Sequence, residues 1–267
     1  MKAGLSPTLR AVVAAVKLVA AEEIMPRYKK VALQRKSDGS LCTEADLAAQ
    51  EALTRKLQGI VNVPVIGEEM STEEHHRLWD ENSEQGVWCI DPIDGTSNFV
   101  RGLSYFAVSA ALVKGGHSVL GVVYDPVGDE AFAAELGRGA FLNGEKLVSR
   151  NAARELSTAL ANVDLKRLGG ALAKRLVAEP PFSSQRNFGA SALEWCYTAA
   201  GRYDLYLHGG QMLWDYAAGS LVLQEAGGKV CCLDRDDFRD CEVWRRSVIA
   251  SADPALFEQW RDWVRAQ

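Results

Sequence analysis

The segment Asp91–Thr96 reads Asp-Pro-Ile-Asp-Gly-Thr and brings two carboxylates close together in the chain. The apolar run Val87–Ile90 precedes it and is typical of a buried strand, so Asp91 is expected where that strand ends. Pro92 presets its own φ and Gly95 tolerates a tight turn, which lets both carboxylates face one point. Oxygen ligands of this kind suit a hard cation such as Mg²⁺. Taken alone, the hexapeptide favours an ordinary Asp-Pro turn that closes a strand.

Two distant segments supply further carboxylates. Glu68 follows the apolar run Val63–Ile66, and Asp215 opens a long apolar-periodic stretch that reaches Gly228. We assign Asp215 to the N-cap position of a helix, where capping alone explains an aspartate. Acidic residues after strands are also common in loops, so Glu68 by itself is ambiguous. The three acidic segments together predict one metal site assembled from distant parts of the chain.

These motifs, in this order and spacing, resemble the inositol monophosphatase family of magnesium-dependent, lithium-sensitive phosphatases. The resemblance runs from Lys36 through the Gly137–Gly144 segment to Gly228. The motifs that carry it are Gly67-Glu68-Glu69, Asp91–Thr96, Trp214-Asp215 and Glu225-Ala226-Gly227-Gly228. The resemblance implies an α/β fold built as a layered αβαβα sandwich, like inositol monophosphatase and fructose-1,6-bisphosphatase. It also implies a homodimer.

The resemblance further implies two or three Mg²⁺ ions for each active site. The first ion would be held by Glu68, Asp91 and the carbonyl of Ile93. The second would be held by Asp91, Asp94 and Asp215, and a weaker third would lie near Glu68. The two oxygens of Asp91 can bridge two metal ions about 3.5–4 Å apart, the spacing that two-metal phosphatases use.

The resemblance implies that the Thr96 hydroxyl activates water, paired with the carboxylate of Asp46. The amides of Gly95 and Thr96 would bind the phosphate, and Lys36 would approach the site from a polar loop. The catalytic set is therefore Glu68, Thr96, Asp46 and Lys36. In isolation Asp46 also fits a first-turn acid that favours the helix dipole, and Lys36 also fits a solvated surface lysine.

Substrate choice is less determined by the sequence. Members of the family bind the substrate ring hydroxyls with a glutamate seven residues before the last metal aspartate, and here that position is His208. An imidazole offers at most one acceptor and no negative charge, so inositol specificity stays open. Packing at a strand end explains His208 equally simply. Gly189, Ala190 and Ser191 match the family's substrate-side loop, although the hydroxyl falls one position later.

We therefore predict a phosphomonoesterase that acts on inositol monophosphate or a related polyol or sugar phosphate. Fructose bisphosphatase, 3′-nucleotide phosphatase and histidinol phosphatase are alternatives on the same scaffold. A regulatory protein that binds the transcription machinery is an alternative of another class. Three basic residues are expected to border the pocket, although a surface role fits each of them: Lys166, Arg167 and Arg186.

The elements that must position these residues alternate between helix and strand. Ser6 and Pro7 begin a helix, and Thr43 begins a second one with an acidic residue three positions on. We expect the second helix to bury Leu47, Leu53 and Leu57. Polar residues 30–41 indicate a loop. Strands are expected near 62–66, 87–90, 105–113, 118–125 and 130–136, with a hairpin turn at Asn143-Gly144, and helices near 168–179, 191–201, 215–226 and 254–265.

We expect one domain over residues 1–267, with an N-terminal α+β half to about 150, built on a mostly antiparallel sheet, and an α/β half over 155–267. The net charge of −5 shows no basic footprint, so nucleic acid is not expected as a primary ligand. No apolar run is long enough to span a membrane, and we expect a cytoplasmic enzyme without a signal peptide. The six cysteines are expected to be reduced, mostly buried thiols.

Overall fold

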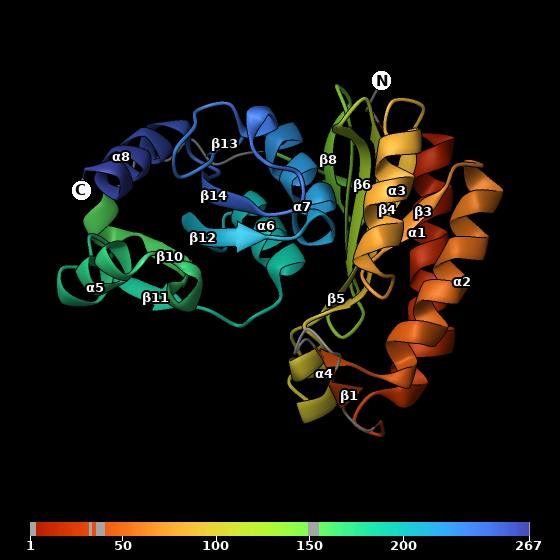
Figure 1. Cartoon of the computed structure of the whole chain (residues 1–267). Coiled ribbons are helices and arrows are strands. Elements are labelled where there is room, and N and C mark those ends of the chain that lie inside the picture. Colours follow the sequence, from red (N-terminus) through yellow and green to blue (C-terminus); the bar gives the residue numbers. More distant parts are fainter. Residues whose placement is uncertain (1–3, 32–33, 36–40, 149–154, 267) are drawn as a thin grey trace.

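The computed structural model describes residues 4–31, 34–35, 41–148 and 155–266. Lys36 and Ser37-Asp38-Gly39-Ser40 lie outside the described residues. Figure 1 shows five layers: α1 and α2, a seven-stranded sheet, α6 and α7, a five-stranded sheet, and finally α5 and α8. This is the αβαβα sandwich that the resemblance implied, and the fold prediction is confirmed.

The larger sheet belongs to the N-terminal half and has the strand order β3-β4-β5-β6-β7-β8-β9. Only β3 and β4 pair in parallel within it, so the expectation of a mostly antiparallel sheet is confirmed. Asn143 and Gly144 both have positive φ and form the expected hairpin turn. The strands are β3 Val65–Gly67, β4 Val87–Asp94, β5 Ala107–Lys114, β6 His117–Asp125, β7 Glu130–Glu135, β8 Gly139–Leu142 and β9 Glu145–Leu147.

Helices α1 (Pro7–Val19) and α2 (Glu44–Ile60) cover the outer face of this sheet. Ser6 caps α1, and Thr43 forms a capping box with Asp46 at the start of α2. The prediction that Leu47 is buried is wrong, because its side chain is 52% exposed. The buried face of α2 is defined by Ala45, Ala49 and Leu53 at helical spacing, and Leu47 lies off that face.

Further short elements complete this half of the chain. Helix α3 was not predicted, although Ser71 and Glu74 form a capping box at its start. The segment is mostly polar, so it contains too few apolar residues to show the periodicity on which helix prediction depends. These elements are a π-helical turn at Ala20–Ile24, a 3₁₀ turn at Met25–Arg27, β1 Gln34–Arg35, β2 Leu41–Cys42, α3 Thr72–Asn82 and α4 Thr96–Arg101.

The smaller sheet belongs to the C-terminal half and has the order β11-β10-β12-β14-β13. Strands β10, β11 and β12 are parallel, whereas β14 runs antiparallel to both of its neighbours. The elements are β10 Leu160–Asp164, α5 Gly170–Ala178, β11 Ser184–Arg186, α6 Ser191–Ala199, β12 Leu205–Gln211, α7 Leu213–Glu225, β13 Lys229–Cys231, β14 Arg246–Ser251 and α8 Pro254–Arg265. Short 3₁₀ turns lie at Leu156–Thr158, Leu165–Arg167 and Phe238–Asp240.

The middle helical layer joins the two halves. Helix α7 is apolar on all sides because a sheet or a helix covers each of its faces. Two glycines allow the close approach: a Cβ on Gly121 would lie 2.9 Å from the Ala218 backbone, and one on Gly219 would lie 2.4 Å from the Trp195 Cβ. One hydrophobic core therefore contains residues from both halves. We infer that the two halves fold as a single domain.

The cysteine prediction is wrong for one pair. Cys232 and Cys241 form a disulfide, whereas Cys42, Cys89, Cys196 and Cys231 are buried. The sequence contains no CxxC spacing, and the residues between Cys232 and Cys241 fold back so that the two sulfurs meet. No helix among the described residues has the length and apolar character needed to cross a bilayer.

Candidate active site

Strand β4 ends in an irregularity that turns two carboxylates toward the middle helical layer. Asp91 pairs with Ser109 and Asp94 with Ala107 on β5, so β4 contains one extra residue between the two pairs. Pro92 lies in this bulge, where a missing N–H costs no ladder hydrogen bond. The Asp91 side chain accepts a hydrogen bond of 3.0 Å from the Ile93 amide.

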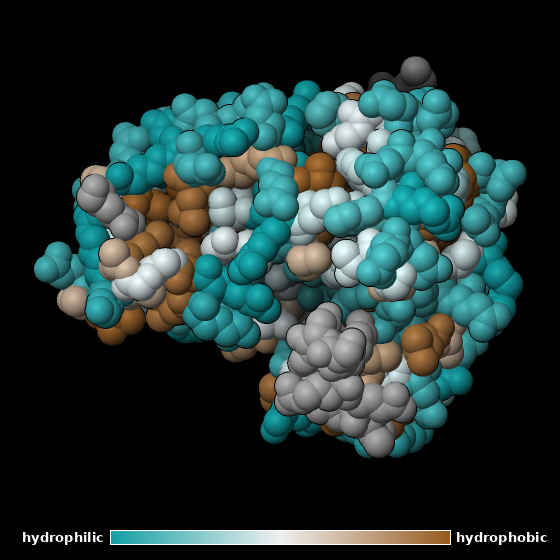
Figure 2. Space-filling view, in the orientation of Figure 1, coloured by the Kyte–Doolittle hydropathy of each residue, from teal (hydrophilic) through white to brown (hydrophobic). Residues whose placement is uncertain are grey.

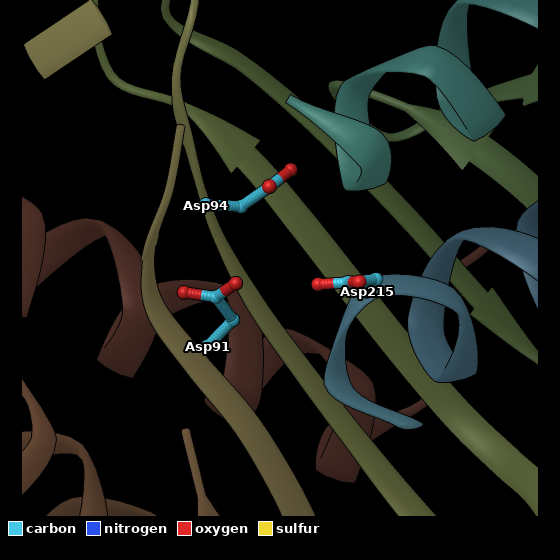
Figure 3. Close-up of side chains that lie close together, drawn as sticks. All are labelled: Asp91, Asp94 and Asp215. Carbon is cyan, nitrogen blue, oxygen red and sulfur yellow. The ribbon is translucent and has the colours of Figure 1, made fainter. Parts of the chain in front are cut away.

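Asp215 faces these carboxylates from the first turn of α7. The assignment of Asp215 to the N-cap is wrong, since Met212 is the N-cap and Asp215 is the third helical residue. Its Oδ2 accepts a hydrogen bond of 2.9 Å from the Met212 amide, which fixes the carboxylate at the helix start. The side chains of Asp91, Asp94 and Asp215 lie close together, and each offers a ligand atom within 4.8 Å of those of the other two (Figure 3).

Glu68 supplies a fourth carboxylate from the loop after β3. Its amide donates to the Ile90 carbonyl at 3.2 Å, which places Glu68 beside the end of β4. Its side chain interacts with the carboxyl of Asp91. The buried ring of His75 on α3 contacts the carbonyl of the preceding Gly67 at 2.7 Å and packs on Trp214, the neighbour of Asp215.

The electrostatics of this cluster favour cations. Burial raises the pKa of Asp91, Asp94 and Asp215, and for Asp91 and Asp94 the neighbouring carboxylates raise it further. An amide hydrogen bond of 2.6 Å from Ala192 partly offsets this effect at Asp94. Three closely spaced carboxylates, with Glu68 interacting with one of them, are costly to ionise together unless cations compensate them. The oxygen-only donor set fits Mg²⁺.

Thr96 and Asp46 lie together at the edge of the cluster. The Thr96 hydroxyl is 3.4 Å from Asp46 Oδ1 and 3.1 Å from the Ile93 carbonyl oxygen. Asp46 Oδ2 accepts hydrogen bonds from the amide and hydroxyl of Thr43, so the capping role and the contact with Thr96 coexist. Burial raises the pKa of Asp46 to about 6. The structure therefore brings both predicted residues to one place.

The predicted substrate-side loop meets the turn that follows the carboxylates. Gly95 has φ +92°, and a Cβ there would lie 3.1 Å from the Ala190 Cβ and from the Tyr105 carbonyl oxygen. Gly189 also has positive φ, and its amide donates to the buried Glu194 at 3.2 Å. The Ala190 side chain is fully buried against this turn.

Ser191 begins α6 beside the same turn, and its side chain hydrogen-bonds Tyr206. Of the basic residues, Lys166 is exposed, and Arg186 is held by the Ser184 hydroxyl and the Gln185 carbonyl. Arg167 contributes electrostatically at Asp215.

His208 is buried on β12, and both of its ring nitrogens have partners. Nδ1 accepts a hydrogen bond of 3.1 Å from the Gly210 amide, and Nε2 lies 3.4 Å from Asp164 Oδ2. Sequence reasoning did not single out Asp164. The sequence does contain a signal for it, because Asp164 directly follows the mostly apolar run Leu160–Val163. Glu68 and Asp91 were predicted as site residues from the same pattern.

Five alternating layers of helices and sheets therefore enclose a cluster of carboxylates. The chain belongs to the inositol monophosphatase family, whose model matches residues 5–264. It is 31% identical over 239 residues to an inositol-1-monophosphatase of Caulobacter vibrioides, covering 86% of this chain and 90% of that protein. It is 37% identical over 202 residues to the Nus factor SuhB of Pasteurella multocida, covering 73% of each chain. The structure of the suppressor protein SuhB from Bartonella henselae matches with a TM-score of 0.83 at 28% identity, over 97% of this chain and 99% of that one.

Proposed function

We propose that this protein is a Mg²⁺-dependent phosphomonoesterase that acts on inositol monophosphate or a related polyol or sugar phosphate. The observation that carries the proposal is the convergence of four carboxylates beside a threonine–aspartate pair. Family membership supports a phosphatase, and fructose bisphosphate, 3′-nucleotides and histidinol phosphate are the alternative substrates.

Bound Mg²⁺ would neutralise the phosphate dianion and lower the pKa of water in the site. We assign Glu68, Asp91 and the Ile93 carbonyl to one ion and Asp91, Asp94 and Asp215 to another, with a weaker third near Glu68. The acidic cluster of the structure supports this assignment.

The chain's own residues would orient and deprotonate the attacking water. A hydroxyl donates its single proton to one acceptor at a time, so donation from Thr96 to Asp46 leaves the Ile93 carbonyl free to act as a ligand. The Thr96 oxygen then accepts a hydrogen bond from the water, and ionised Asp46 receives the proton through the hydroxyl.

The remaining assignments concern phosphate and substrate contacts. We propose that the amides of Gly95 and Thr96 bind the phosphate, as helix N-termini bind anions. The loop of Gly189, Ala190 and Ser191 would border the leaving group, and its contact with Gly95 supports that placement. His208 would lie on the same side, and Lys36 would approach from the loop before α2.

A phosphate-release screen tests the proposal. Inositol, sugar and nucleotide phosphates are assayed with Mg²⁺ and with EDTA, for the wild type and for Asp91→Asn. We expect Mg²⁺-dependent turnover that Asp91→Asn lowers by roughly a hundredfold or more, because an amide cannot bridge two cations. Asp234→Asn, which removes an exposed carboxylate elsewhere, serves as the matched control. Full turnover in EDTA or in Asp91→Asn would contradict the proposal.

A regulatory role is the second candidate, because a relative 37% identical to this chain bears the name Nus factor. We propose that this regulatory role would coexist with catalysis. Every position predicted to bind a metal ion offers a carboxylate or a backbone carbonyl oxygen, so the metal site would be retained. Affinity capture with purified bacterial RNA polymerase and Nus factors tests it. Capture by the wild type and by Asp91→Asn alike would support a role independent of catalysis, and absence of capture at micromolar concentration would reject it.

We also propose a homodimer. Figure 2 shows apolar side chains gathered between α5 and α8, where Leu172, Leu233 and Val264 line a groove of about 550 Å³ and Val177 is 69% exposed. Light scattering at micromolar concentration should give twice the chain mass, and a monomer mass would reject the dimer.

A further inference from the structure

Strands β10 and β12 bring an acidic side chain to the position where the sequence predicts a substrate contact. Asp164 and His208 are direct partners in the parallel register of the two strands. Asp164 is the last residue of β10, whereas His208 lies in the middle of β12, which continues through Gln211 toward the helix that carries Asp215. In parallel α/β sheets the carboxyl-terminal edge of the strands is where ligands bind.

The residues after Asp164 are held over the same edge. A Cβ on Gly209 would lie 1.8 Å from the Arg167 carbonyl oxygen, so the 3₁₀ turn Leu165–Arg167 rests directly on the β12 backbone. Both His208 and the guanidinium of Arg167 lie close enough to act electrostatically on the carboxyl of Asp215. Asp164 is therefore linked to the Asp215 side of the site through its direct neighbour His208 and through the turn that carries Arg167.

The hydrogen bonds of His208 assign its tautomer. The Gly210 amide donates to Nδ1, so in the neutral ring that nitrogen carries no proton. The ring proton is then on Nε2, which lies 3.4 Å from Asp164 Oδ2. Neither nitrogen is left to accept a hydrogen bond from a substrate hydroxyl.

Asp164 has the acceptor capacity that His208 lacks. Burial disfavours its charge, but the hydrogen bond from His208 and the charges of Lys166 and Arg167 hold its pKa below the ordinary value. Its Oδ1 accepts from the Lys166 amide at 3.2 Å and its Oδ2 faces His208. Each carboxylate oxygen has two acceptor sites, so both oxygens retain capacity for a hydroxyl donor.

We infer that Asp164 is the carboxylate that binds hydroxyl groups of the leaving group, and that His208 is the positioning residue that orients it. This inference rests on the proposed phosphatase function and refines its substrate class to uncharged polyol or sugar monophosphates. An ionised Asp164 accepts hydrogen bonds from hydroxyl groups and repels a second phosphate. Lys166 offsets that repulsion weakly, because its side chain is 73% exposed and solvated.

The test compares two esters of one ring, inositol 1-phosphate and cyclohexyl phosphate, which differ in the ring hydroxyls. We expect Asp164→Asn to lower kcat/KM for inositol 1-phosphate by roughly tenfold or more, mainly through KM, because charged hydrogen bonds are lost. Cyclohexyl phosphate should change by less than about twofold. Turnover of fructose bisphosphate relative to inositol 1-phosphate should rise. An unchanged ratio between the two ring esters would overturn the inference.

His208 variants test the positioning role. His208→Leu removes the donor and should reproduce the KM effect of Asp164→Asn, while His208→Gln retains an N–H donor and should restore part of it. Asp234→Asn is the control for loss of a carboxylate. If His208→Leu and His208→Gln have the same inositol 1-phosphate KM as the wild type, His208 does not position Asp164 and that half of the inference fails.

Binding of free inositol separates this inference from the proposed function. Ligand-observed NMR with the wild type and Asp164→Asn requires no turnover. If the wild type hydrolyses none of the esters but binds inositol, and Asp164→Asn does not, the phosphatase proposal fails and the inference stands. If neither binding nor the ester ratio responds to Asp164→Asn, the inference fails whatever the activity.

Discussion

The side-chain amide of Asn98 donates a hydrogen bond of 2.6 Å to the carbonyl oxygen of Phe188, ninety positions further along the chain. The same amide donates to the Tyr105 carbonyl at 2.7 Å. Asn98 lies on α4, two residues after Thr96, whereas Phe188 directly precedes Gly189. The Asn98 side chain therefore connects the turn proposed to bind phosphate (Gly95-Thr96) with the loop proposed to border the substrate (Gly189–Ser191).

Asn98→Ala should weaken both stability and substrate binding. Two carbonyl oxygens lose their donor, which costs about 1–3 kcal/mol in the free energy of unfolding. We also expect a lower kcat/KM, because the substrate loop loses its link to the phosphate turn. Denaturant unfolding and steady-state kinetics measure the two effects. Asn82→Ala is the control, since Asn82 bonds only the Leu78 carbonyl within its own helix. Equal kinetics in both variants would refute the link.

Without divalent cations, the protein should lose stability as pH rises. Burial holds the pKa of Asp91 and Asp94 above the ordinary value in the folded state. Stability from these groups is fully present below their unfolded pKa near 4 and is lost as pH rises through the folded pKa. We therefore expect the free energy of unfolding to fall as pH rises from 5 to 8 in EDTA. Mg²⁺ should flatten this slope.

Thermal unfolding across that pH range, in EDTA and in Mg²⁺, measures the effect. Asp91→Asn removes one of the crowded carboxylates and should reduce the slope in EDTA. A wild-type stability that is independent of pH in EDTA would show that the carboxylates do not repel one another in the fold.

Asp46 should produce the acidic limb of the pH–rate profile. Its pKa is raised to about 6 by burial, and a proton acceptor must be ionised, so kcat/KM should rise with pH through about 6 and then level off. Asp46→Asn should remove this limb and lower kcat by about 10²–10⁴-fold.

Glu74→Gln is the matched control, because Glu74 occupies the same capping-box position at the start of α3 as Asp46 does in α2. It should change stability little, because a glutamine at this position also reaches back to the N-cap amide, and it should leave the pH profile intact. If Asp46→Asn behaves like Glu74→Gln, Asp46 is only a helix cap.

Lithium should inhibit turnover at fixed Mg²⁺, as the family resemblance implies. Li⁺ is a small hard cation that suits the same carboxylate oxygens but carries half the charge, so it occupies a site without the same stabilisation of the phosphate. Initial rates over a Li⁺ series, with K⁺ at equal ionic strength as control, measure this. Equal rates in both salts would contradict the lithium sensitivity inferred from the family resemblance, but they would not contradict the proposed Mg²⁺ dependence.

The sequence alone determined much of the fold and the composition of the site. Local signals were sufficient for elements such as α1 and α2, because Ser6 and Thr43 act on amides a few residues away. The hexapeptide Asp91–Thr96 likewise carries its own turn chemistry, with Pro92 and Gly95 at the positions that need them. The prediction of buried residues from apolar periodicity was wrong at Leu47, which is apolar but lies outside the buried face of its helix.

Tertiary structure decided the relationships between distant segments. The partnership of Asp164 with His208 depends on the register of β10 against β12, and a shift by one residue would move one side chain to the opposite face of the sheet. The disulfide of Cys232 and Cys241 depends on how the segment between them folds back. Residue types and local spacing determine which groups can do chemistry. Only the packing of the layers determines which of them meet, because contacts between distant segments depend on strand register and close helix packing rather than on neighbours in the chain.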